Sequence, residues 1–252
     1  EVTGTHAGKR YLASVSSGGY AQKAIPHEAA LIPIPDAVTD QQALCMLVQG
    51  STAWHLLKTM GSVKAGQTVV IHAAAGGVGT IAIQLAKMWG AKVIAVTSSQ
   101  EKVDLAKSLG ADEVVDARDS DLGKALRAAN GGRGVDLVLE MVGGTTFDQS
   151  FLALGNFGKL ITFGMASRTA PTPIHPGSLM HGSKTVAGFW LANCFGKKEL
   201  MNDVIAELFA LVASGKLRPV IGSTYPLSKA ADAHRAMLAR ETTGKVALDP
   251  AL

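Results

Sequence analysis

Short apolar runs alternate with amphipathic segments through the middle of the chain. The runs are rich in β-branched residues and have few polar positions, as in Thr68–His72, which is typical of strands buried in a parallel sheet. Between the runs, apolar residues recur at helical spacing, as Val78, Ile81 and Leu85 do. The predicted strands are Thr68–His72, Lys92–Thr97, Glu113–Asp116, Val135–Glu140, Lys159–Gly164 and Thr185–Leu191. The predicted helices between them are Gly76–Trp89, Ser99–Leu109, Asp119–Ala129 and Thr145–Leu154. This alternation predicts an α/β fold, a doubly wound parallel sheet with helices on both faces.

The flanking segments follow a different pattern. Before the alternation, we expect a short strand at Gly18–Ile25 and a helix over Asp40–Met60 that breaks at Gly50. The proline-rich stretch Ala170–Gly177 is expected to be a surface loop. After it, the sequence predicts an amphipathic helix at Glu199–Ser214, a strand at Ile221–Tyr225, a helix at Ser228–Arg240 and a strand at Lys245–Leu248.

A small-residue turn joins the first regular strand to its helix. Ala73, Gly76 and Gly79 follow one another at intervals of three, which is the dinucleotide-binding fingerprint with alanine at the first glycine position. Small residues let backbone N–H groups and a helix N-terminus meet a pyrophosphate. The strand–turn–helix context is the one that the motif requires, so we expect a Rossmann-type cofactor site here. Its predicted members are Ala75, Gly76, Gly77, Val78 and Gly79.

The end of the second strand indicates which dinucleotide binds. An NAD site usually carries Asp or Glu there, about 20 residues after the glycines, to accept the ribose hydroxyls. This chain has Ser98, Ser99 and Lys102 instead, and Arg118 closes the next strand. Hydroxyls and cations without a carboxylate favour the 2′-phosphate of NADP(H). The alternative interpretation is a capping box of Ser98 with Glu101, with Lys102 as a solvated surface charge.

Composition excludes several other classes of protein. Of the 252 residues, 47% are hydrophobic and 17% are charged, which suits a chain with a sizeable core and excludes a disordered one. The net charge of +4 (24 Lys and Arg less 20 Asp and Glu) lacks the basic clusters of a nucleic-acid platform, which argues against nucleic acid as a partner. The apolar run Ala43–Val48 is far shorter than the ~18 residues that span a bilayer, and no signal-peptide pattern opens the chain.

The two cysteines, Cys45 and Cys194, are too few for a zinc lobe and far apart in sequence. We interpret them as buried structural thiols of a reducing compartment, which predicts a cytoplasmic protein. The seven histidines show no ligand spacing, so no metal site is expected, and His72 is predicted to be a core histidine at a strand end.

Several longer segments together resemble the zinc-free quinone oxidoreductase branch of the medium-chain dehydrogenase/reductase superfamily. They are GGYAQK at 18–23, VQGSTAWHLL at 48–57, VVIHAAAGGVG at 69–79, QLAKMWGAKVIAVTSSQEKVDLAKSLGAD at 84–112, GFWL at 188–191 and TTGKVAL at 242–248. The resemblance runs over essentially the whole chain and is specific in combination.

The resemblance implies further contacts with the cofactor. Thr52 would approach the nicotinamide; the alternative is a helix-interior hydroxyl that bonds its own backbone. The backbone at two strand ends would hold the nicotinamide ribose and carboxamide, although the same residues also suit core strand ends. These residues are Phe163, Gly164, Phe189, Trp190 and Leu191. Lys245 would lie near the phosphates, or be an ordinary surface lysine. Ala117 stands where many relatives place a ring beside the adenine.

Compared with the family, the chain lacks a long segment before Val2. The resemblance therefore implies a cofactor domain at 51–192, with remnants of a GroES-like catalytic domain at 1–50 and 193–252. We expect either a fragment, a cleaved or trimmed chain, or a natural short form.

The resemblance implies hydride transfer from NADPH to a quinone or another conjugated carbonyl acceptor such as an enone. No side chain stands out as a catalytic acid. Two alternatives remain open, an enoyl-thioester reductase and a non-enzymatic NADPH-binding protein such as a sensor, a crystallin-like protein or an RNA-binding relative. The apolar strand Thr185–Leu191 at an open sheet edge predicts a homodimer, unless Glu199–Ser214 covers that edge in a monomer.

Overall fold

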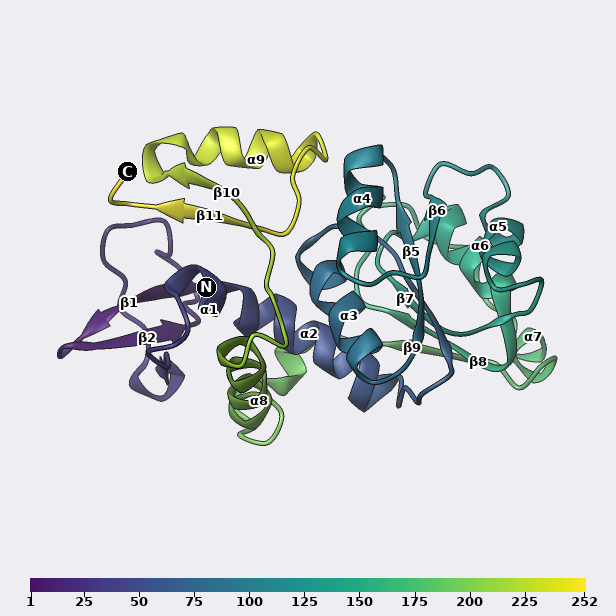
Figure 1. The fold of residues 1–252 in the computed structure, drawn as a ribbon, viewed down its shortest axis with the longest axis horizontal. Helices are drawn as coiled ribbons and strands as arrows, with labels where there is room; N and C mark the ends of the chain where they lie inside the picture. The colour runs from purple at the N-terminus through teal and green to yellow at the C-terminus, as the bar shows by residue number, and fades with distance from the viewer. The chain divides into compact units, whose positions relative to one another are not determined.

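The computed structural model describes all 252 residues and divides them into two compact units. Unit 1 comprises Glu1–Thr52, Gly76–Ile81 and Leu191–Leu252, and unit 2 comprises Ala53–Ala75 and Ala82–Trp190. Figure 1 shows the elements of both. No helix is both long and apolar enough to cross a bilayer.

Unit 2 is built on a six-stranded sheet in the order β6-β5-β4-β7-β8-β9, with every neighbouring pair parallel. The strands are β4 (Thr68–Ile71), β5 (Lys92–Thr97), β6 (Glu113–Asp116), β7 (Val135–Glu140), β8 (Leu154–Thr162) and β9 (Thr185–Gly188). The helices are α3 (Gly77–Met88), which begins in unit 1, α4 (Gln100–Ser108), α5 (Leu122–Ala129), α6 (Gly144–Ala153) and α7 (Pro176–Met180). In Figure 1, α3 and α4 lie on one side of the sheet and α5 and α6 on the other. The predicted doubly wound parallel sheet is confirmed.

A continuous apolar layer fixes the α5 and α6 face of this sheet. Alternate strand residues such as Val70, Ile94 and Val138 point to that face and are fully buried against the helices. Leu126 of α5 and Phe147 of α6 meet them there. Because both faces of the sheet are covered, the central strands carry almost no polar residues, which made them recognisable in the sequence.

Unit 1 contains two small sheets and several helices. Its strands are β1 (Val2–His6), β2 (Lys9–Ala13) and β3 (Ile32–Pro33), which form an antiparallel sheet, and β10 (Ile221–Pro226) and β11 (Lys245–Asp249), which pair in parallel. Its helices are α1 (Asp40–Cys45), the start of α2 (Ser51–His55), α8 (Asn202–Ala213) and α9 (Ala230–Leu238). Short 3-10 turns lie at Glu28–Ala30, Leu191–Cys194 and Leu227–Lys229.

Several predicted elements were wrong in detail. The strand expected at Lys159–Gly164 runs instead from Leu154 to Thr162. Gly18–Ile25 forms no strand, and Ile25 is 97% exposed, because the segment has no partner strand. The helix from Asp40 does not break at Gly50 but runs through π-helical turns at Met46–Gly50 and Leu56–Met60. A Cβ at Gly50 would lie 3.1 Å from Leu208 Cδ1, so this glycine serves close packing against α8. The last strand of the large sheet ends at Gly188 rather than Leu191.

Candidate functional site

The carboxyl ends of the parallel strands gather most of the predicted site residues of unit 2. Ala75 follows β4, Ser98 follows β5 and Arg118 follows β6. Phe163 follows β8, and Phe189 follows β9. Since all six strands are parallel, these positions share one edge of the sheet, where open α/β sheets bind their ligands.

The small-residue turn that follows β4 has no room for larger side chains. Ala73 has a positive φ of 48°, and its neighbours Ala74 and Ala75 are buried. The N–H of Ala74 donates to the carbonyl of Val96 over 3.2 Å, which holds the turn against β5. A bulky side chain in this stretch would separate the two strands.

Within unit 1, the glycines of the turn approach the C-terminal part of the chain. Gly76 forms a parallel bridge with Gly244. A Cβ at Gly77 would lie 2.8 Å from Gln49 Cγ and 3.5 Å from the carbonyl oxygen of Gly244. The helix α3 begins at Gly77, so Gly77, Val78 and Gly79 form its first turn, whose N–H groups have no partner in the helix. These groups and the positive end of the helix dipole can bind a pyrophosphate.

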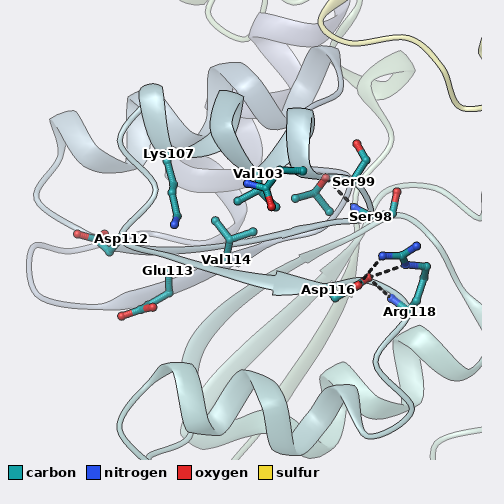
Figure 2. A pocket seen from close by; sticks show the side chains of 11 residues that line it. Ser98, Ser99, Val103, Lys107, Asp112, Glu113, Val114, Asp116 and Arg118 are labelled. Carbon is teal, nitrogen blue, oxygen red and sulfur yellow. Dashed lines mark hydrogen bonds and ion pairs between the residues drawn. The ribbon is translucent and has the colours of Figure 1, made fainter.

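Beyond the end of β5 lies an open hollow of about 360 Å³ (Figure 2). Its lining consists of Thr97, Ser98, Ser99, Gln100, Val103, Lys107, Asp112, Glu113, Val114, Asp116 and Arg118. The structure thus brings Ser98, Ser99 and Arg118 together, as the 2′-phosphate prediction requires. Lys102 does not line the hollow, whereas Lys107 of the same helix does.

The two serines do not form the alternative capping box. Ser99, not Ser98, is the N-cap residue of α4, and its side chain makes no capping hydrogen bond. The N–H of Ser98 donates to Thr97 Oγ1 over 2.7 Å. Capping therefore does not use the Ser99 hydroxyl, which lines the hollow beside Ser98.

Arg118 is held by a carboxylate that the sequence analysis did not assign to the site. Its Nη2 lies 2.7 Å from Asp116 Oδ2, and its Nε donates to Asp116 Oδ1 over 3.0 Å. The backbone N–H of Arg118 also donates to Oδ1, over 2.9 Å. These hydrogen bonds lower the pKa of Asp116 to about 2. The sequence showed the pair only as neighbours two residues apart, which does not reveal where their side chains point.

The strand ends predicted for the nicotinamide side are loops anchored to the sheet. The N–H of Phe163 donates to the carbonyl of Glu140 over 3.0 Å, and that of Phe189 donates to the carbonyl of Thr162 over 2.9 Å. The ring of Phe189 packs on the buried His55, with 5.6 Å between centroids, whereas Trp190 is 72% exposed. The sequence analysis missed His55. Its Nδ1 lies 2.8 Å from Thr59 Oγ1, and the spacing of four residues between the two, which is one helical turn, was visible in the sequence.

Glu140, also missed, ends the central strand β7 at the same edge of the sheet. Its side chain is fully buried, and Oε1 accepts the N–H groups of Val142 (2.6 Å) and Gly143 (2.9 Å). Oε2 has no hydrogen-bond partner, and burial raises the pKa of the carboxyl group. A carboxylate that follows the apolar run Leu137–Leu139 was the signal available in the sequence.

Thr52, Leu191 and Lys245 lie in unit 1. Thr52 and Leu191 are each 7% exposed, so both are buried. Lys245 Nζ lies 2.6 Å from Glu1 Oε2 and donates to Gln49 Oε1 over 3.3 Å, with the lysine side chain only 13% exposed. Lys245 is therefore largely buried, and Gln49 links it to the glycine turn.

His72 is a core histidine, as predicted. It is 2% exposed, its Nε2 lies 2.8 Å from Ser150 Oγ, and burial lowers its pKa to about 4. No three His, Cys, Asp or Glu side chains gather in a way that could hold a metal ion. Cys45 and Cys194 are buried free thiols.

Comparisons with known proteins identify close relatives over nearly the whole chain. The family model described as zinc-binding dehydrogenase matches residues 77–210. A quinone oxidoreductase of Pseudomonas aeruginosa is 33% identical and aligns with 99% of this chain and 77% of its own length. The structure of an Escherichia coli quinone oxidoreductase complexed with NADPH has a TM-score of 0.89 at 32% identity and covers 98% of this chain and 76% of its own. The Thermus thermophilus quinone oxidoreductase, solved alone and with NADPH, has a TM-score of 0.84 at 34% identity, over 97% of this chain and 78% of its own.

Proposed function

Because the chain belongs to the zinc-binding dehydrogenase family, in its zinc-independent quinone oxidoreductase branch, we propose that it is an NADPH-dependent oxidoreductase that reduces a quinone or another conjugated carbonyl acceptor. The resemblance stated from the sequence is thereby confirmed. The observation that carries the proposal is the similarity over nearly the whole chain to quinone oxidoreductases, of which two were solved with NADPH. These relatives favour this function over the enoyl-thioester reductase and the non-enzymatic binding protein.

The residues of the turn suit the pyrophosphate of this cofactor. Gly77, Val78 and Gly79 would direct backbone N–H groups at the phosphates, since no side chain at Gly77 stands between them and a ligand. We propose that Lys245, held beside Gly77 through Gln49, adds positive charge on the phosphate side. Ala75 and Gly76 keep the backbone close enough for this contact.

The hollow beyond β5 suits the 2′-phosphate. Ser98 and Ser99 supply hydroxyl donors, and Arg118 supplies a guanidinium, which is the side chain best shaped to bind a phosphate through two hydrogen bonds. A carboxylate at the end of β5, which would favour the ribose hydroxyls of NADH, is absent there. Lys102 does not line this hollow, so we propose that it contributes only longer-range positive charge near the 2′-phosphate.

In unit 2, we propose the loops after β8 and β9 for the nicotinamide end of the cofactor; Thr52 of unit 1 stays a prediction from the family resemblance. When bound, the nicotinamide ring supplies the hydride. The backbone of Phe163, Gly164, Phe189, Trp190 and Leu191 would orient the ring and exclude water from it. The ring of Phe189 packs on the buried His55, and this contact helps to hold the start of the loop after β9 in place. No side chain of this chain is proposed as the proton donor to the acceptor.

Turnover and binding of purified protein test the proposal together. We expect NADPH to be oxidised when 1,4-benzoquinone or cyclohexenone is added, which the loss of NADPH absorbance measures. We also expect Arg118→Ala to weaken the binding of NADPH roughly tenfold or more, because a charge-assisted hydrogen bond to the phosphate is lost. The affinity for NADH should stay nearly unchanged. Lys102→Ala is the matched control, with the same change of charge outside the hollow, and should have a smaller effect.

Other outcomes would contradict parts of the proposal. Equal affinities for NADPH and NADH in the wild-type protein would refute the cofactor assignment. Tight NADPH binding without turnover on either acceptor would instead favour the non-enzymatic alternative. Turnover confined to an enoyl thioester would favour the reductase of acyl substrates.

A further inference from the structure

Asp116 occupies the binding face of the one arginine in the hollow. Arg118 Nη2 lies 2.7 Å from Oδ2 of this carboxylate, and Arg118 Nε lies 3.0 Å from Oδ1. Two parallel contacts of this kind are the geometry in which a guanidinium binds either a carboxylate or a phosphate. A phosphate that approaches the Nε and Nη2 side of Arg118 therefore finds a carboxylate already there.

The other charged side chains of the hollow lie away from the pair of Asp116 and Arg118. Figure 2 shows Asp116 and Arg118 beside Ser98 and Ser99 at one end, with Lys107, Asp112 and Glu113 at the other. Asp112 is also paired with Lys87 over 2.8 Å. Among the residues that line the serine end, the arginine is the only cation and the aspartate the only anion, so the paired end is neutral.

Resting on the proposed function, we propose that Asp116 competes with the 2′-phosphate of NADPH for Arg118 and thereby sets how strongly the site prefers NADPH over NADH. The 2′-phosphate has to displace the carboxylate or to share the guanidinium with it at close range. NADH carries a hydroxyl at that position and meets neither cost. Asp116 is thus a specificity-determining residue that acts through Arg118.

Because both side chains are exposed to solvent, the ion pair between Arg118 and Asp116 can open and re-form. The Arg118 side chain is 71% exposed and that of Asp116 is 48% exposed. Exposed ion pairs are weak because water and salt screen them, so the pair opens when a doubly charged phosphate arrives. The carboxylate weakens NADPH binding without preventing it.

The substitution Asp116→Asn isolates this role. Asparagine keeps an oxygen for the backbone N–H of Arg118 and so preserves the turn after β6. We expect NADPH to bind roughly threefold to tenfold more tightly to the variant, with the NADH affinity unchanged. Adenosine 2′,5′-bisphosphate, which has the phosphate but no nicotinamide, should show the same gain, whereas 5′-AMP should not.

Two further variants show whether the effect passes through Arg118. In an Arg118→Ala background, Asp116→Asn should give no gain in NADPH affinity. Glu113→Gln is the matched control, because it removes a carboxylate from the same strand and the same hollow at its far end; it should leave the ratio of the two affinities unchanged. The melting temperature of each variant reports whether it is folded.

The outcomes separate this inference from the proposed function. A wild-type protein that binds neither nucleotide overturns both. NADPH binding that does not tighten in Asp116→Asn overturns the inference alone. A gain that persists without Arg118, or that Glu113→Gln reproduces, also overturns it, since the effect would then be general charge rather than competition.

Discussion

At the scale of single residues, the buried imidazole of His72 links stability to pH. Its pKa is about 4 in the folded protein because burial disfavours the charged ring, whereas an unfolded histidine titrates near 6.5. As the pH falls through this interval, the unfolded chain takes up a proton that the folded protein does not. The folded state therefore keeps this contribution above pH ~6.5 and loses it progressively towards pH ~4.

We expect this histidine to cost the protein roughly 2–3 kcal/mol of unfolding free energy between about pH 7 and about pH 4.5. Urea unfolding at the two pH values measures it. In His72→Gln that part of the pH dependence should vanish, while the exposed-site control His181→Gln should keep it. An equally steep loss of stability in His72→Gln would show that other groups are responsible.

Sequence reasoning reached some site residues and not others for a physical reason. Ser98 and Arg118 follow two neighbouring strands, and parallel strand ends meet at one edge, so their proximity was predictable. The pairing of Arg118 with Asp116 depends on side-chain direction after a strand end, which the spacing leaves open. The contact of His55 with Phe189 joins positions far apart in the chain, and no local sequence pattern predicts it.

At the scale of elements, strands that carry an apolar, β-branched run were predictable and strands without one were not. The strands β5, β6 and β7 have the predicted bounds, although β6 lies at an edge of the sheet. The hairpin of β1 and β2 was missed, since its residues are mostly polar or exposed and its turn is marked only by Ala7 and Gly8, both with positive φ.

The first turn of α3 gives a test at this scale. We expect Gly77→Ala to weaken the binding of NADPH by roughly tenfold or more, because a methyl group would stand where the phosphate meets the backbone. The same methyl group would collide with Gln49 Cγ at 2.8 Å and reduce stability. Calorimetry and nucleotide titration separate the two effects.

The double variant Gly77→Ala with Gln49→Ala removes the collision. Its melting temperature should return towards that of Gln49→Ala alone, while NADPH binding stays weak. Full recovery of NADPH affinity in the double variant would count against a phosphate at this turn.

At the scale of the whole molecule, β9 is the last strand of the six-stranded sheet, and its outer side has no partner strand in the chain. We propose that two copies pair through this edge about a twofold axis, which would continue the sheet through both subunits. Light scattering should then give about twice the chain mass of 26.1 kDa. A mass near that of one chain would reject the homodimer.

The site of contact can be tested at Gly188. This glycine is exposed at the end of β9, has no positive φ, and a Cβ there would meet no atom within 4 Å. Gly188→Lys should therefore keep the fold and split the dimer, whereas Gly188→Ala should remain dimeric. Gly4→Lys places the same charge on the equally unobstructed β1 and should have no effect. An intact dimer in Gly188→Lys would place the contact elsewhere.

The division of the chain between its units also has a consequence for synthesis on the ribosome. Every stretch of unit 2 has been synthesised once Trp190 has been added, so its sheet can close before Leu191–Leu252 are available. Unit 1 also needs Leu191–Leu252, which are translated after all of unit 2, to complete the partners of Glu1–Thr52. The strands β1 and β2 and the helix α1 therefore wait for partners that are made later. On the nascent chain we expect these elements to be more accessible to chaperones and proteases than the large sheet.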